Sequence, residues 1–389
     1  MRILMVLASE FPPDIRVENE ISALQKAGHE IHLSCQTRSG RKVYEVTNGL
    51  VIHRKPISTF IYKSGVGALR FSFYFRFWKR FLNELISQVK FDAIHIHDLP
   101  LASVGSEMAQ KTGASFVLDL HEHWPSLLEV STHTKSFLGK FLSKHDQWMR
   151  YELKMCNLAK SIIVISDEFK QRLVGFGVAK EKIHVVSNTL NLDVVRNINR
   201  LPKSDHFELF YGGGINRHRG LEIVIDAIPE IIKTIPNFRF KVVGDGNFLG
   251  ELKRQIELKG IANHVVFTGY QPFTSLMEQL SSSSVSIIPF LKTNHSEIAV
   301  PHKIFQYIYM EVPVLASNCS TITRIINETG AGLVYEWNSK TDFVEKIIEL
   351  YTNYSYWNSK MPKAKEMVLE KYTWQVDSQV LWEIYNSKR

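Results

Sequence analysis

Cysteine is scarce in this chain of 389 residues, where Cys35, Cys156 and Cys319 stand far apart. An odd number of cysteines without a CxxC pair argues against a disulfide framework and against a structural zinc site. Such sparing use of cysteine fits a reducing compartment, so we expect a cytoplasmic protein.

Long apolar runs are also missing, because no stretch approaches the roughly 20 apolar residues that a membrane-spanning helix needs. The apolar start of the chain, residues 1–8, ends at Ser9 and Glu10 without a small-residue cleavage pattern, which predicts a buried strand and not a signal peptide. With 389 residues and 44% hydrophobic content, the chain predicts two globular domains.

Acidic residues are nearly missing between residues 38 and 80, where Glu45 stands among ten lysines and arginines. The formal net charge of +8 lies entirely in the first half, since residues 1–200 carry 27 basic and 19 acidic side chains. Such a field predicts an anionic partner: a membrane surface, a nucleic acid or a charged substrate. No nucleic-acid recognition motif accompanies the charge, so we expect no nucleic acid as a partner.

Residues 69–86 have apolar side chains at helical spacing and polar ones opposite. The apolar stripe consists of Phe71, Tyr74, Phe75, Trp78, Phe81, Leu82 and Leu85. This pattern predicts an amphipathic helix, which either packs on its own sheet or lies on an anionic membrane surface. In the second case, residues 38–86 form the membrane-facing region.

Short apolar strands alternate with helical patterns along the chain. Strands are predicted at residues 2–8, 31–35, 93–97, 116–120 and 161–165, and then at 207–211, 240–243, 265–268, 285–289 and 312–317. The alternation predicts an α/β fold of two Rossmann-like domains with parallel sheets, over residues 1–195 and 205–370. Doubly wound sheets bind ligands at the carboxyl ends of their strands, so we expect the site in the interdomain cleft.

The run 210–220, FYGGGINRHRG, stands just before a helical pattern. Gly212, Gly213 and Gly214 let backbone N–H groups approach an anion, and the following helix adds the positive end of its dipole. Arg217 and Arg219 supply guanidinium groups that suit a diphosphate. The run therefore predicts a phosphate site, with a merely tight connection as the alternative.

Further segments, taken in order, resemble the retaining glycosyltransferases of family 4. They are residues 12–20, 119–122, 185–188, 212–220, 242–246, 269–270, 287–290, 301–307 and 312–317. The resemblance covers nearly the whole chain and implies the GT-B architecture of two facing Rossmann-like domains. It implies an acceptor-binding N-terminal domain, a nucleotide-sugar-binding C-terminal domain, and a terminal helix, about residues 373–389, that packs back on the first domain.

The resemblance also implies an activity: a sugar moves from a nucleotide sugar to a hydroxyl of a saccharide acceptor, expected to be lipid-linked, in cell-surface polysaccharide or glycolipid synthesis. His121 would contact the transferred sugar, Arg219 would stabilise the leaving diphosphate, and Arg16 and Glu122 would face the acceptor. The implied donor-binding residues are Gly212, Gly213, Gly214, Arg217, Gly244, Tyr270, Glu297, Ala299, Val300, Lys303 and Gln306.

No metal or other cofactor is expected. The sequence has no evident DxD motif at the end of a strand, and His95 and His97 alternate on one strand face without an evident third ligand. We expect these two histidines to be structural or to line the cleft.

Two donor motifs depart from the family pattern. Gly214 stands where the family has an arginine, so Arg219 must do more, with Arg217 or Lys303 as helpers. Gln306 replaces the second glutamate of a glutamate pair, and Glu297 is one residue out of register for the first. Two alternatives therefore stay open: a GT-B nucleotide-sugar epimerase and a catalytically impaired GT-B scaffold. In the active case we expect a peripheral protein on the inner face of the cell membrane.

Overall fold

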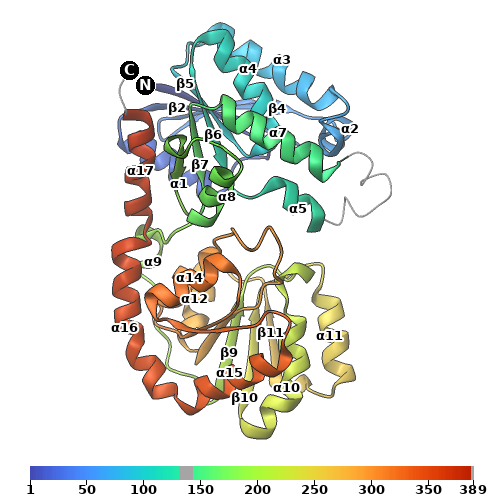
Figure 1. Ribbon diagram of the computed structural model, residues 1–389, viewed down its shortest axis with the longest axis vertical. Coiled ribbons are helices and arrows are strands. Elements are labelled where there is room, and N and C mark those ends of the chain that lie inside the picture. Colours follow the sequence, from blue (N-terminus) through green and yellow to red (C-terminus); the bar gives the residue numbers. More distant parts are fainter. Residues whose placement is uncertain (131–142, 387–389) are drawn as a thin grey trace. The chain divides into compact units, whose positions relative to one another are not determined.

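The computed structural model describes residues 1–130 and 143–386. The chain divides into two compact units (Figure 1). Unit 1 comprises Met1–Ser187 and the chain from Asp377 onward, and unit 2 comprises Asn188–Val376.

Unit 1 is built on an eight-stranded sheet in the order β3-β4-β2-β1-β5-β6-β7-β8. All neighbouring pairs are parallel except β3 with β4. The strands are β1 Arg2–Leu7, β2 Glu30–Thr37, β3 Tyr44–Thr47, β4 Leu50–Pro56, β5 Ala93–His97, β6 Ser115–Leu120, β7 Ser161–Val164 and β8 Ile183–Val185.

Helices cover both faces of this sheet. They are α1 Ile15–Lys26, α2 Thr59–Ser64, α3 Phe73–Gln88, α4 Ala102–Thr112, α5 Trp124–Val130, α7 His145–Leu158, α8 Asp167–Gly175 and α17 Trp374–Asn386, with 3-10 turns η1 Gly65–Gly67, η2 Leu99–Leu101 and η4 Lys180–Lys182. Figure 1 shows α3, α4 and α7 together on one side of the strands. A Cβ added to Gly105 of α4 would lie 2.2 Å from the Ile96 side chain, so α4 packs tightly on β5.

Unit 2 contains a six-stranded, fully parallel sheet in the order β11-β10-β9-β12-β13-β14. Its strands are β9 Phe207–Gly212, β10 Phe238–Val243, β11 Val265–Gly269, β12 Val285–Ile288, β13 Val314–Ser317 and β14 Gly332–Tyr335. Its helices are α9 Leu192–Val195, α10 Glu222–Thr234, α11 Leu249–Leu258, α12 Phe273–Ser281, α13 His302–Tyr309, α14 Ser320–Thr329, α15 Lys340–Thr352 and α16 Tyr354–Lys371, with η5 Arg217–Arg219 and η6 Ala262–His264.

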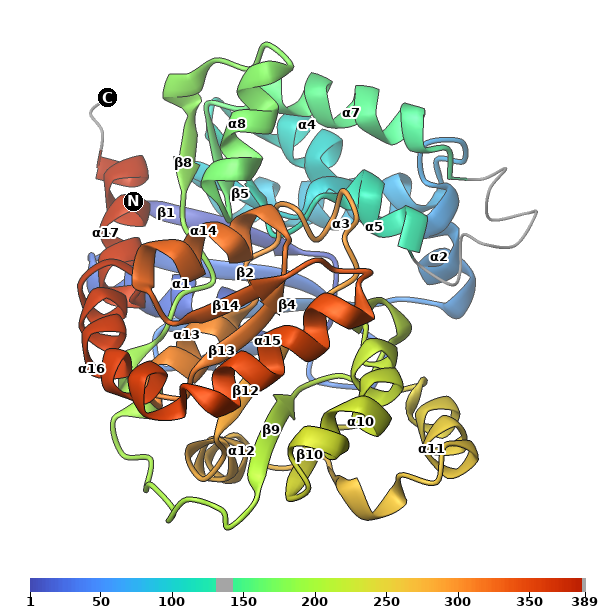
Figure 2. The same ribbon diagram turned by 60° about the horizontal axis from the view of Figure 1, so that its bottom comes forward.

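Two separate apolar cores enclose the sheet of unit 2. One includes side chains of α10, α11 and α15, and the other includes side chains of α13, α14 and α16. Figure 2 shows α10 and α15 running side by side. A sheet covered on both faces explains the nearly continuous apolar character of these strands.

Each sheet has one position where the strand order reverses. In unit 1 this switch lies between β1 and β5, and in unit 2 it lies between β9 and β12. Open α/β sheets bind ligands beside such switch points, at the carboxyl ends of the strands. The residues that follow β1, β5, β9 and β12 therefore stand where such sheets bind ligands.

The predicted α/β fold class is confirmed. The sequence-based prediction missed β3, β4, β8 and β14, and α3 begins at Phe73 and not at residue 69. The apolar stripe of this helix is mostly internal: Tyr74, Trp78 and Phe81 are at most 6% exposed, and Leu82 and Leu85 are also buried. Of the two possibilities for the helix, packing on its own domain accounts for these residues.

Candidate functional site

The glycine-rich turn after β9 is locked to the turn after β10 by backbone contacts. The Gly213 N–H donates to the Val243 carbonyl at 2.9 Å, and the Ile215 N–H donates to the Asp245 carbonyl at 2.8 Å. Gly244 has φ 145°, and a Cβ there would lie 2.0 Å from the Gly213 carbonyl oxygen. Only glycine permits this approach, so the two turns form one rigid edge at the switch point.

Two cations, Arg219 and Lys303, lie beside this edge. The Lys303 Nζ is 3.0 Å from the position of a Cβ on Gly213 and 4.1 Å from the centre of the Tyr211 ring. The Arg219 guanidinium lies over the Phe290 ring at 4.6 Å, and its Nε is buried without a hydrogen-bond partner. Burial, together with the charge of Arg219, holds the pKa of Lys303 well below its ordinary value.

Within the described part of the chain, neither cation forms an ion pair with a carboxylate. The charge of Arg219 therefore disfavours protonation of Lys303, and in the described residues no carboxylate offsets this effect. An anion placed between them would remove this cost. The rigid turn and the two cations together form what we call the cation pair site.

The structure does not bring Arg217 into the cation pair site. Its side chain is 74% exposed, lies 4.0 Å from the Glu222 carboxylate, and passes 5.9 Å from the centre of the Phe248 ring. Gly214 is exposed, and a Cβ there would meet only the Asn216 side-chain nitrogen, at 3.4 Å. The turn thus has room for the arginine that the family pattern places at Gly214, and Lys303 approaches from α13 on the neighbouring side.

The other predicted donor-binding residues lie on three loops and one helix of unit 2. Gln306 follows Lys303 by one turn of α13, and Tyr270, just after β11, is 81% exposed. Glu297 accepts a hydrogen bond from Ser320 and lies 3.8 Å from the Lys292 ammonium. Ala299 is half-buried and Val300 is buried, while Gly212, at the end of β9, donates its N–H to the Tyr307 hydroxyl.

In unit 1, Asp119 is the centre of a buried polar cluster at the end of β6. Its carboxylate accepts from the Arg16 Nη2 at 2.8 Å, from the His121 Nε2 at 2.7 Å and from the His97 Nδ1 at 3.3 Å. Burial alone would raise the pKa of Asp119, but the charges of Arg16 and His121 hold it well below its ordinary value. Asp119 is therefore a buried, fully engaged carboxylate.

Arg16 supports this cluster from α1. The side chain is 6% exposed and contacts Asp119, Glu20 at 3.1 Å and the Val186 carbonyl at 2.9 Å. Asp14 caps the helix by accepting from the Val17 N–H, which fixes the position of Arg16 in the first turn. The Arg16 guanidinium is turned into the interior of unit 1, and its contact with an acceptor stays a prediction.

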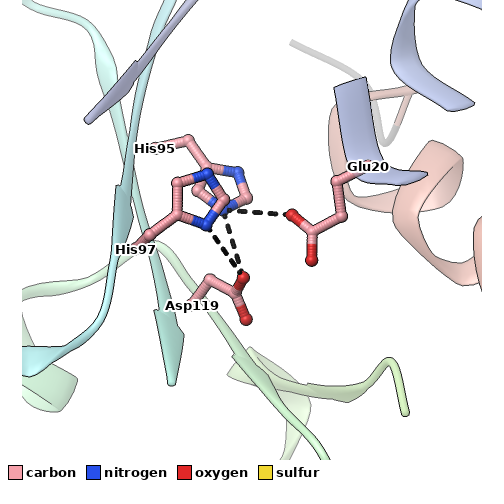
Figure 3. A group of neighbouring side chains, drawn as sticks. All are labelled: Glu20, His95, His97 and Asp119. Carbon is pink, nitrogen blue, oxygen red and sulfur yellow. Dashed lines mark hydrogen bonds and ion pairs between the residues drawn. The ribbon is translucent and has the colours of Figure 1, made fainter. Parts of the chain in front are cut away.

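Figure 3 shows four buried residues of this cluster, Glu20, His95, His97 and Asp119. The His95 Nε2 is 3.6 Å from both carboxylates, and its Nδ1 is 2.5 Å from the Tyr385 hydroxyl of α17. Sequence reasoning missed Glu20, although its i, i+4 spacing from Arg16 on a helix with a buried face was a usable signal.

The four groups have ligand atoms within 4.8 Å of one another, close enough to surround a metal ion. However, the Arg16 guanidinium already lies against both carboxylates of the group, Glu20 and Asp119. Burial also raises the pKa of Glu20 well above its ordinary value, which favours the neutral acid. The Arg16 guanidinium thus already places a positive charge beside the two carboxylates, as a bound metal ion would.

His121 is the member of this cluster that reaches the surface, with its side chain 15% exposed. Burial would lower the pKa of His121, but the carboxylates of Asp119 and Asp98 raise it to about 9. The Nδ1 atom lies 3.7 Å from the Asp98 Oδ2, and the neighbouring Glu122 is half-buried. At neutral pH the ring is therefore a charged donor, anchored at Nε2 and turned toward Asp98 at Nδ1.

Asp98 has an unusual backbone conformation, with φ 65° and ψ 158°. This region is populated almost only by glycine, and a side chain there costs about 1–3 kcal/mol. The sequence-based prediction gave Asp98 no role.

Two family models match the chain, one in each half. The model described as Glycosyltransferase Family 4 matches residues 15–194, and the model described as Glycosyl transferases group 1 matches residues 206–353. Among curated relatives, an uncharacterized glycosyltransferase of Methanocaldococcus jannaschii is 24% identical over 75% of this chain and 74% of its own length. The phosphatidyl-myo-inositol mannosyltransferase of Mycolicibacterium smegmatis is 21% identical over 100% of this chain and 94% of its own.

Solved structures with the same fold include a sucrose-phosphate synthase from Thermosynechococcus elongatus, with a TM-score of 0.78, 14% identity and coverage of 99% of this chain and 98% of that one. The Anabaena protein HepE, solved in complex with UDP-glucose, has a TM-score of 0.73 and 13% identity, with both chains covered completely. At these identities the similarity shows the fold. Across residues 1–130 and 143–386, none of the helices combines the length and apolar character needed to cross a bilayer.

Proposed function

The chain belongs to the GT-B glycosyltransferases, with a Family 4 first half and a group 1 second half, and we propose that it is a retaining enzyme acting on a nucleotide sugar and a saccharide hydroxyl. Its relatives include enzymes of polysaccharide and glycolipid synthesis. The observation that carries the proposal is the cation pair site, where Arg219 and Lys303 face each other without a carboxylate.

Sugar transfer needs a leaving diphosphate whose charge is stabilised as the glycosidic bond breaks. Arg219 supplies a positive charge at the carboxyl end of β9, and Lys303 is a second basic group whose protonation a bound diphosphate would favour. The start of α10 lies directly behind Gly220. Preorganised charges of this kind stabilise a transition state because they need no reorientation during the reaction. The cations belong to the protein, so we propose that the departing diphosphate needs no metal ion.

The cation pair site predicts selective binding of nucleoside diphosphates and their sugars. UDP, GDP, ADP and the corresponding nucleotide sugars can be compared as a panel in a thermal-shift assay. The ligands that carry one particular base should raise the melting temperature of the protein, since a ligand that binds only the native state stabilises it. The rise should persist in EDTA and disappear in Arg219→Ala. Arg217→Ala is the matched control from the same turn, and it should keep the shift.

The outcomes separate the alternatives. A chain that binds no member of the panel would be a scaffold, and Gly214 and Gln306 would then be the residues to explain. A chain that binds a nucleotide sugar and isomerises it without any acceptor would be an epimerase. Release of the nucleoside diphosphate that depends on an added saccharide would support transfer.

The proposal places the acceptor on a membrane, supported by an exposed aromatic cluster of Phe60, Phe71 and Phe73 in unit 1. These side chains are 64%, 48% and 44% exposed, and Phe73 contacts both of the others. Some of the basic residues between 38 and 80 form ion pairs, among them Arg41, Arg54, Lys55 and Lys79. Lys63 closely follows Phe60 in the chain, the Arg38 guanidinium lies 4.4 Å from the centre of the Tyr62 ring, and both basic side chains are exposed. Exposed aromatic rings beside basic residues suit a peripheral contact with anionic lipid.

Replacing Phe60, Phe71 and Phe73 together with serine should reduce cosedimentation with vesicles of mixed neutral and anionic phospholipid at least tenfold, because the apolar contact with lipid is lost. Wild-type binding should weaken as salt is added. The matched control replaces Tyr356, an exposed aromatic residue of unit 2, with serine and should bind like the wild type. Equal binding by the triple variant and the wild type would remove the aromatic cluster from the proposal.

We also propose that the reaction takes place on the cytoplasmic side of the membrane. Cys35, Cys156 and Cys319 are all free and buried, which agrees with a reducing compartment.

A further inference from the structure

Asp98 has a positive φ at a place in the fold where non-glycine residues rarely have one. The other two such residues among those described are Asn48 and Glu311. Asn48 stands in the turn between β3 and β4, before Gly49, and Glu311 follows the end of α13. Turns and helix ends commonly contain left-handed residues. Asp98 instead joins a central strand to a buried 3-10 turn, with an extended ψ of 158°.

The surroundings of Asp98 hold this conformation in place. Its N–H donates to the Asp119 carbonyl at 2.8 Å, and the following Leu99 and Leu101 are at most 1% exposed. Glycine would satisfy the same backbone path without strain. A carboxylate therefore stands at a position where the backbone conformation favours glycine, which points to a role outside folding.

The carboxylate shares its exposed edge with His121. The Asp98 Oδ2 and the His121 Nδ1 are 3.7 Å apart, beyond the range of a hydrogen bond. The His121 Nε2 is already bonded to Asp119 at 2.7 Å, so the ring cannot turn toward Asp98 without losing that bond. A separation of 3.7 Å allows one hydroxyl oxygen to lie at roughly 2.8 Å from both atoms, the usual O–H···O and N–H···O distance.

We propose that Asp98 and His121 form a hydroxyl-binding pair for a saccharide, in which His121 Nδ1–H donates to the hydroxyl oxygen and Asp98 accepts its proton in a hydrogen bond. This inference rests on the proposed function and adds a substrate-contacting residue to it. The hydroxyl belongs either to the transferred sugar or to the acceptor, and both present the same chemistry. Asp119 and Arg16 act behind the pair as positioning residues for His121.

The stability of Asp98→Gly is the first test, and it needs no substrate. If the side chain is kept for binding, removing it relieves the backbone, and the melting temperature of Asp98→Gly should equal or exceed that of the wild type. A clear fall in melting temperature would mean that the carboxylate serves the fold, and the proposal would be wrong. Asp146→Asn, whose side chain is 89% exposed, controls for loss of one acid in unit 1.

The second test measures ligand binding by the Asp98→Asn variant with calorimetry. The affinity for UDP-glucose is compared with that for UDP, and the affinity for GDP-mannose with that for GDP. For a hydroxyl of the transferred sugar, the preference for the nucleotide sugar over its diphosphate should fall at least tenfold while diphosphate affinity stays unchanged. For a hydroxyl of the acceptor, both affinities should persist while transfer to octyl glycosides falls at least tenfold.

The proposed pair would be wrong if the Asp98→Asn variant kept both its binding affinities and its transfer rate within twofold of the wild-type values. A wild-type protein that binds none of these nucleotides would instead contradict the proposed function, and the melting temperature of Asp98→Gly would still report on Asp98 independently.

Discussion

Replacing Arg219 with alanine should lower kcat for sugar transfer by about 10²–10³-fold, the range found when one preorganised charge or hydrogen-bond donor is removed from a developing anion. The side chain lies over Phe290, with its Nε buried and unpartnered, so its charge is held at the cation pair site before substrate arrives. Gly214 provides no second guanidinium in the turn. Only Lys303 remains beside the turn to stabilise the leaving diphosphate.

The coupling between Arg219 and Lys303 gives this prediction a second measurable part. Arg219 contributes to the depressed pKa of Lys303, so removing Arg219 makes the Lys303 amine easier to protonate, which partly compensates the loss of the guanidinium charge. The effects of Arg219→Ala and Lys303→Ala should therefore not be additive, and a double-mutant cycle on kcat would measure the difference.

Arg217→Ala is the matched control for both measurements, because this arginine stands two residues away with its side chain 74% exposed. It should retain kcat within a few fold. Equal losses in Arg217→Ala and Arg219→Ala would show that the turn senses only total charge, against the arrangement described here.

The glycine turn and the parallel sheets could be predicted from the sequence because their signals are local. A turn is predicted by three consecutive glycines before a helical pattern, and buried strands are predicted by short apolar runs, without knowledge of the rest of the chain. The sequence could not show which of Arg217 and Lys303 accompanies Arg219, because that depends on the approach of α13 to β9 across the sheet. Similarly, the spacing of residues 71–85 revealed a helix, but burial of Trp78 and Phe81 was decided by the packing of unit 1.

The cluster behind His121 was harder to foresee. Arg16 and Asp119 lie 103 residues apart, and Tyr385 joins His95 from the other end of the chain. Their meeting follows from the register that places His97 beside Asp119 and from the position of α17 in unit 1. The strained φ of Asp98 could not be predicted from the sequence either, since an aspartate after a strand is a common loop residue.

Replacing Arg16 with methionine should lower the free energy of unfolding by about 3–5 kcal/mol, the cost of removing one partner from a buried ion pair. Methionine keeps much of the volume but leaves the Asp119 carboxylate, 0% exposed, without the guanidinium at 2.8 Å. Chemical denaturation followed by circular dichroism would measure the change. Arg2→Met is the matched surface control, since its ion pair with Glu30 is 39% and 47% exposed on the two sides, and it should cause a much smaller loss.

The double variant Arg16→Met/Asp119→Asn decides whether uncompensated charge causes the loss. With both charges gone, the double variant should recover part of the stability that Arg16→Met loses, because the desolvated carboxylate is no longer present. His121 would then lose the carboxylate that anchors its Nε2 and raises its pKa. Stability should return while sugar transfer does not, which would separate the role of Asp119 in folding from its role in positioning His121. If the double variant is less stable than Arg16→Met, packing or hydrogen bonds dominate over charge in this cluster.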